Sequence, residues 1–269
     1  MACIVSFAIQ KGGVGKTTST VTTAHALAEL GKRVLVIDMD PQHNASIVLG
    51  KVAPYEQPRT IIDIFREPDM NLSACAVASK YENVDLISSH IDLFLIPNSL
   101  APGSPKMIMG LRSRIDQASQ DHYDYILIDC PPNLGGPFVT NALAASDYYI
   151  IPLEAESYFA LKGVQQFMEM VRDIRDTINP KLKLLGVLIT MADMRTNVSR
   201  AMVESIKRFF GEDLVFQTII TRSTSINKAN MMRKTTLALD SRQLGAQDYV
   251  QFAKEMIQWV ERKDLTRTN

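Results

Sequence analysis

The stretch IQKGGVGKTT at residues 9–18 carries the residue types of a loop that binds nucleotide phosphates. In the usual pattern, G-x-x-x-x-G-K-[ST], backbone amides face the phosphates, the lysine neutralises the β- and γ-phosphates, and the hydroxyl binds Mg²⁺. Lys16 and Thr17 take these last two positions, but Gln10 replaces the first glycine and a second lysine, Lys11, lies inside the loop. The predicted phosphate-binding residues are Lys11, Gly12, Gly13, Val14, Gly15, Lys16, Thr17 and Thr18.

Acidic residues follow two of the apolar runs. Asp129 ends the run YILI and precedes two prolines, so we expect it at the carboxyl edge of a sheet, where it would hold Mg²⁺ through a coordinated water. The segment VIDMDPQHN at 36–44 offers Asp38 and, just beyond the strand, Asp40. Asp40 is placed to orient a water molecule for in-line attack on a γ-phosphate.

The elements that must position these residues alternate along the chain. Apolar runs predict strands, and longer periodic segments predict helices. The strands are expected at 3–9, 33–38, 92–97, 125–130, 148–153 and 183–189, and the helices at 17–30, 104–120, 157–178 and 196–210. Prolines in 51–90 indicate loops around a short helix at 60–66. This alternation predicts an α/β fold: one doubly wound domain over 1–269, with a mostly parallel sheet and helices on both faces.

Composition limits the partners. The chain has 29 Lys+Arg and 29 Asp+Glu, so no overall charge attracts it to a polyanion. Residues 195–269, however, hold 13 Lys/Arg against 8 Asp/Glu, and are the part to consider for nucleic-acid binding. No leader segment or bilayer-spanning run is evident, and the three cysteines are widely spaced. We therefore expect a cytoplasmic protein with reduced thiols.

Three motifs together carry a family resemblance. KGGVGKTT at 11–18, DMDPQHNAS at 38–46 and ILIDCPPNLG at 126–135 resemble the ParA/MinD ATPases, whose phosphate loop deviates from the usual pattern. Their spacing is most similar to that of the Soj-like ParA partition ATPases, and DSRQLGAQDYVQFAKEM at 240–256 resembles that family's closing helix.

The resemblance implies a Mg²⁺-dependent ATPase that forms a homodimer with ATP. In this family the extra loop lysine, here Lys11, reaches across the dimer to the partner's phosphates, as an arginine finger does. Lys11, Lys16 and Asp40 would then be the catalytic residues. The activator would be a ParB-like protein or a cargo adaptor.

The resemblance also implies sequence-independent binding to nucleoid DNA. The predicted contact residues are Arg195, Arg200, Arg222, Lys228, Arg233 and Lys234. Arg222 matches the first arginine of the family's basic stretch, whereas Ser225 replaces the second. In the helix at 196–210, the three-to-four spacing of Val198, Met202, Ile206 and Phe209 predicts the buried stripe. The chain starts at its first strand, so we expect no helix-turn-helix extension.

Three alternatives stay open from the sequence. One is an ATPase that positions a non-DNA cargo, such as a microcompartment or a chemotaxis cluster. Another is a protein that keeps its nucleotide as a fixed ligand. The third is a MinD-like membrane ATPase, but Val250, Ala253, Ile257 and Val260 share a helix face suited to packing on the sheet. The remaining tail, ERKDLTRTN, has no apolar face to insert, so membrane association is not expected.

Overall fold

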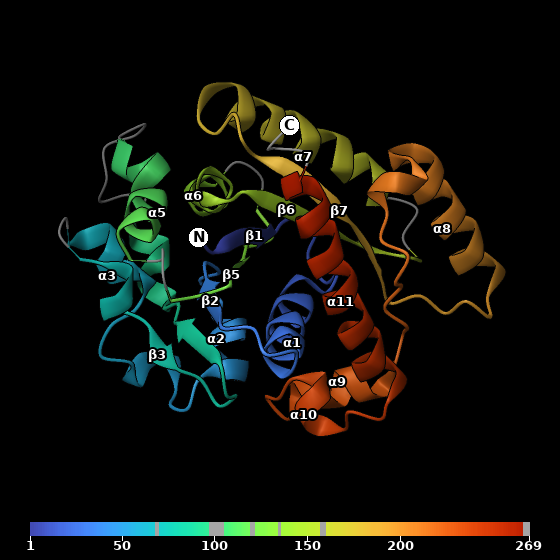
Figure 1. The fold of residues 1–269 in the computed structure, drawn as a ribbon, viewed down its shortest axis with the longest axis horizontal. Coiled ribbons are helices and arrows are strands. Elements are labelled where there is room, and N and C mark those ends of the chain that lie inside the picture. The colour runs from blue at the N-terminus through green and yellow to red at the C-terminus, as the bar shows by residue number, and fades with distance from the viewer. Residues whose placement is uncertain (68–69, 97–104, 119–121, 134–135, 157–159, 266–269) are drawn as a thin grey trace.

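Seven strands form one sheet in the described part of the chain, with the order β3-β4-β2-β5-β1-β6-β7 (Figure 1). The computed structural model describes residues 1–67, 70–96, 105–118, 122–133, 136–156 and 160–265. The strands are β1 (Cys3–Phe7), β2 (Val34–Asp38), β3 (Val77–Ala78), β4 (Val84–Ile87), β5 (Tyr125–Asp129), β6 (Tyr148–Glu154) and β7 (Lys183–Thr190). All pairings are parallel except that of the edge strand β3 with β4.

Helices connect most of these strands. The α-helices are α1 (Lys16–Glu29), α2 (Asn44–Leu49), α3 (Ile61–Arg66), α5 (Pro105–Ala118), α6 (Pro137–Ala145), α7 (Ala160–Thr177), α8 (Asn197–Phe210), α9 (Thr224–Met231), α10 (Thr236–Leu239) and α11 (Leu244–Leu265). Short 3₁₀ helices are η1 (Pro54–Glu56), η2 (Leu72–Ala74), η3 (Ile91–Leu95) and η4 (Glu212–Leu214). No helix among the described residues combines the length and apolar character needed to cross a bilayer.

The hydrophobic core lies in two layers, one on each face of the sheet. In β5, Ile126 and Ile128 pack into one layer and Leu127 into the other, as the alternation of a strand requires. The first layer takes side chains from α3, α5, α6, α7 and α8, and the second from α1, α2, α10 and α11. This arrangement confirms the predicted doubly wound α/β sheet with buried strands and helices on both faces.

The strand predicted at 92–97 is wrong. Its described part lies mostly in the 3₁₀ helix η3, where the His90 ring accepts a hydrogen bond from the Asp92 amide at 3.2 Å and caps the helix. The place beside β2 belongs to β4 instead, in the region predicted as loops. The short helix predicted at 60–66 is confirmed by α3. Position 97 and the predicted helix ends at 104, 119–120 and 157–159 lie outside the described residues.

The buried stripe of α8 differs from the prediction at two positions. Met202 and Ile206 are buried as expected, but Val198 is 61% exposed and Phe209 44% exposed. Ser199 and Val203 complete the stripe instead. The buried face of α8 is therefore rotated about the helix axis toward Ser199 and Val203, and the prediction that Val198 and Phe209 are buried is wrong.

The closing helix α11 packs on the sheet as predicted. Ala253 and Val260 are buried in the second core layer, and Val250 and Ile257 are partly buried against it. Larger side chains that were not singled out, Tyr249, Phe252 and Met256, fill the centre of the same face.

Candidate nucleotide-binding site

The phosphate-binding loop lies between β1 and α1 at the carboxyl edge of the sheet. The connection from β1 runs through α1 to β2, whereas the connection from the neighbouring β5 runs through α6 to β6 on the other side of β1. Ligand sites of α/β folds form where neighbouring strands connect in opposite directions. Gly13 and Gly15 have φ of 76° and 83°, a left-handed conformation that glycine adopts without strain. Gly15 caps α1, which begins at Lys16, so the loop leads directly to a helix N-terminus suited to phosphate.

A hydrogen bond anchors the loop to β7. The hydroxyl of Thr190, the last residue of β7, donates to the Val14 carbonyl at 2.9 Å, and both residues are buried. Thr190 is not among the site residues predicted from the sequence. Its position at the end of a predicted strand was the signal that could have found it.

Lys16 lies inside the loop among acidic groups. Its side chain is almost completely buried, and its Nζ donates to the Lys11 carbonyl at 2.7 Å. Burial lowers the pKa of Lys16, while the charges of Asp129, Cys130 and Asp40 act to raise it. The loop lysine and the two predicted aspartates are therefore brought together, as the sequence indicated.

Two buried carboxylates lie side by side beneath the loop. Asp38 on β2 and Asp129 on β5 are register partners, and both side chains are fully buried. Asp38 accepts hydrogen bonds from the Ser46 amide at 2.8 Å and the Ser46 hydroxyl at 2.7 Å, which fix the start of α2. Burial raises the pKa of Asp38 despite these bonds. Burial, and then the charge of Asp38, raise the pKa of Asp129 well above its ordinary value.

Asp129 fits a metal that is shared with a nucleotide. Its Oδ2 is buried without a hydrogen-bond partner among the described residues, and the Thr17 hydroxyl acts to lower its pKa. Nowhere in the described ranges do three or more His, Cys, Asp or Glu side chains form a group that could hold a metal. Mg²⁺ commonly takes one or two protein oxygens together with substrate phosphates and water. Thr17 and Asp129 are suited to that arrangement.

Asp40 lies where the sequence places it, just beyond the end of β2. It is 7% exposed, and its Oδ1 accepts a hydrogen bond from the Gln42 amide at 2.9 Å. Its own amide donates to Asp38 Oδ1 at 3.1 Å. Its charge acts to raise the pKa of Lys16, so it lies near enough to the loop to influence this lysine. A role in orienting the attacking water stays a prediction.

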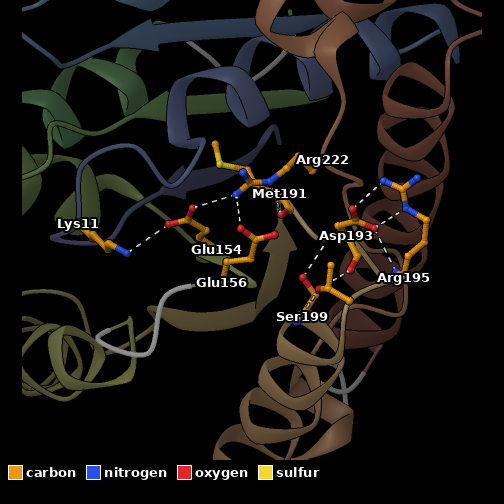
Figure 2. A network of polar contacts seen from close by, with 9 residues as sticks. Lys11, Glu154, Glu156, Met191, Asp193, Arg195, Ser199 and Arg222 are labelled. Carbon is orange, nitrogen blue, oxygen red and sulfur yellow. Dashed lines mark hydrogen bonds and ion pairs between the residues drawn. The ribbon is translucent and has the colours of Figure 1, made fainter.

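Lys11 takes part in a network of charges that the sequence did not reveal. Its Nζ lies 3.3 Å from Oε2 of Glu154, the last residue of β6 (Figure 2). Oε1 of Glu154 lies 3.5 Å from Arg222, which also pairs with Glu156 at 2.8 Å. Arg222 thus lies beside the phosphate loop. Glu154 could have been found from the sequence by the strand-end criterion that selected Asp129.

The predicted DNA-contacting residues fall into separate places. Arg195 and Arg200 lie at the start of α8, where Arg195 forms two hydrogen bonds of 2.8 and 2.7 Å with Asp193 and lowers the pKa of that carboxyl to about 2. The exposed Lys228 is on α9, and the exposed Arg233 and Lys234 follow it. Figure 1 shows α8 and α9 at different positions along one side of the molecule.

Known proteins resemble this chain over most of its length. A family model described as AAA domain matches residues 2–184. The chain is 38% identical to the sporulation initiation inhibitor protein Soj of Bacillus subtilis (strain 168), covering 95% of this chain and 98% of that protein. It is 34% identical to the chromosome partitioning protein ParA of Caulobacter vibrioides, covering 94% and 93%.

A solved structure that contains bound ligands is also similar to this chain. Cobyrinic acid a,c-diamide synthase from Mycobacterium smegmatis, with bound ATP analog and magnesium, superposes with a TM-score of 0.80 at 31% identity, covering 94% of this chain and 93% of that one. The sheet, the deviant loop and these relatives define a nucleotide-binding protein of the P-loop class. The chain belongs to the ParA/MinD superfamily of ATPases, on the branch of the Soj-like partition ATPases.

Proposed function

We propose that this protein is a Mg²⁺-dependent ATPase that dimerises on binding ATP and binds nucleoid DNA without reading its sequence. With a ParB-like activator it would move or position plasmid or chromosomal DNA. The observation that carries the proposal is the buried Lys16, which lies at the N-terminus of α1 and whose pKa the charges of Asp129 and Asp40 act to raise. The similarity to a protein named for chromosome partitioning supports the proposal that the cargo is DNA.

Each residue of the site has a role in the proposed reaction. Lys16 leaves the Lys11 carbonyl and neutralises charge on the β- and γ-phosphates. Thr17 and, through a coordinated water, Asp129 would hold Mg²⁺, which would supply positive charge to neutralise the phosphates. Asp40 orients water for attack, and Lys11 of each protomer supplies a cation to its partner's site.

Turnover separates this reaction from the use of a nucleotide as a fixed ligand. Phosphate release should be measured at saturating ATP with Mg²⁺ and with excess chelator. Multiple turnovers that require Mg²⁺ are expected. A single equivalent of tightly held nucleotide, with no continuing phosphate release, would identify a structural ligand instead.

The DNA step follows from two-fold symmetry. A single protomer presents few phosphate contacts, whereas an ATP-bound dimer presents each of them twice. The logarithm of the affinity falls with the logarithm of the salt concentration, with a slope of about 0.9 per neutralised phosphate. DNA binding should therefore require ATP, ignore sequence and weaken steeply as salt rises.

A salt titration of unrelated duplexes tests this step. Arg195→Ala or Arg222→Ala should lower the slope by about two units per dimer, at about 0.9 per contact, while ATP-driven dimerisation persists. Arg175→Ala is the matched control, since that arginine is half exposed on α7 in a pair with Asp176 and is not a predicted contact. Equal affinity without nucleotide, or strong preference for one duplex, would disprove non-specific, ATP-dependent binding.

A further inference from the structure

The carboxylate of Glu154 lies between two cations of different origin. One oxygen faces Lys11 of the phosphate loop at 3.3 Å, and the other faces Arg222, from the segment before α9, at 3.5 Å (Figure 2). The Lys11 side chain is 35% exposed and that of Glu154 is 24% exposed, so the pair is open enough to exchange partners.

The sheet fixes this carboxylate relative to the loop. Glu154 ends β6, and its register partner on β7 is Thr190. The Thr190 hydroxyl holds the Val14 carbonyl of the same loop that carries Lys11. The ion pair is therefore built from neighbouring strand ends, and the Lys11 ammonium is directed toward its own protomer.

We infer that Glu154 is a positioning residue that holds Lys11 in cis and so competes with the partner's nucleotide for this ammonium. The inference rests on the proposed function, in which Lys11 acts in trans. One ammonium cannot pair closely with Glu154 and with the partner's phosphates at once. Each protomer must break its own pair before the dimer is complete. Breaking the pairs costs free energy, so they raise the dissociation constant of the ATP-bound dimer.

The ion pair between Lys11 and Glu154 is expected to be weak enough to break when the dimer forms. Removing a partly exposed ion pair changes an equilibrium by about 2- to 5-fold. A symmetric dimer breaks two such pairs, so the effects multiply to about 4- to 25-fold in the dimer dissociation constant. Screening by salt weakens the pair, so this difference should shrink as the ionic strength rises.

The test is Glu154→Gln, which keeps the shape and removes the charge. Dimerisation is measured by sedimentation with a non-hydrolysable ATP analogue and Mg²⁺, at low and moderate salt. The variant should dimerise about 4- to 25-fold more tightly than the wild type at low salt, with a smaller gain at moderate salt. Binding of the analogue to the monomer should be unchanged. Glu156→Gln is the matched control, since Glu156 pairs with Arg222 at 2.8 Å, and its dimer should match the wild type.

A second background separates positioning from a general structural effect. In Lys11→Ala protein, the further change Glu154→Gln should not alter dimerisation, because the held ammonium is gone. If Glu154→Gln shifts dimerisation equally in both backgrounds, or not at all in the wild type, the inference is overturned. The proposed function fails differently: Lys11→Ala alone would then turn over ATP at the wild-type rate.

Discussion

Neutralising Asp129 should stabilise the nucleotide-free protein while impairing its use of Mg²⁺. Asp129 is fully buried, next to Asp38 in the sheet, and its Oδ2 has no hydrogen-bond partner among the described residues. Asparagine has nearly the same shape and carries no charge. The change Asp129→Asn therefore removes a buried anion and its repulsion with Asp38, at the expense of a weaker attraction to Lys16.

The direction of the pH dependence follows from the raised pKa. A buried carboxyl whose pKa lies above that of the unfolded chain keeps its proton to higher pH when folded, so wild-type stability falls as pH rises from about 4 through the folded pKa. At about pH 4 and below, the acid is protonated in both the folded and the unfolded state, so asparagine imitates it and the two proteins should unfold alike. Toward pH 8 the variant should gain about 1–3 kcal/mol, the cost of a buried group left unpaired. Each kcal/mol corresponds to about 2–4 °C in Tm.

The assay is thermal unfolding without nucleotide, in chelator, from about pH 4 to 8. Asp38→Asn is the matched control, because that buried carboxylate accepts hydrogen bonds from Ser46 and should be less stable than Asp129→Asn throughout. With ATP, Asp129→Asn should need about 10- to 100-fold more Mg²⁺. An Asp129→Asn protein that is less stable than the wild type at pH 8, or equally sensitive to Mg²⁺, would refute the assignment.

Two further substitutions test the other roles. Lys16→Ala should weaken ATP binding by at least about 30-fold, because a buried, hydrogen-bonded charge contributes about 2–5 kcal/mol to binding, and ATP-driven dimerisation should fail with it; unchanged affinity in calorimetry would exclude Lys16 from the site. Asp40→Ala should bind ATP normally but hydrolyse it about 10²- to 10⁴-fold more slowly and accumulate as a dimer on size exclusion; normal turnover or a persistent monomer would remove Asp40 from catalysis.

Local features of the sequence were enough to predict the centre of the site. A glycine-rich turn between a strand and a helix has few possible geometries, so Gly15 and Lys16 could be placed from the loop pattern alone. Asp129 follows a strand that is buried on both faces and is stopped by prolines, which puts its side chain at the carboxyl edge. Both arguments need only neighbouring residues.

Features that depend on distant residues were missed or misplaced. Strand β4 forms because Val84–Ile87 pairs with β2, about fifty residues earlier. No local feature of VDLI distinguishes it as a strand from the more apolar segment at 92–97. Arg222 was predicted as a DNA contact, and its ion pairs with Glu154 and Glu156, at the end of β6 and just beyond it, were missed. Such pairs depend on the topology of the sheet, which a local pattern does not contain.

The two lysines of the loop are linked through one hydrogen bond. Lys16 donates to the carbonyl of Lys11, whose own side chain is held by Glu154. If Lys16 moves to a nucleotide phosphate, as proposed, the backbone at residue 11 loses this bond while its ammonium still has to leave Glu154. Nucleotide binding within one protomer would then loosen the residue that acts on the other. This order, ATP first and the partner second, is what the proposed dimerising ATPase requires, and it would arise from contacts within a single chain.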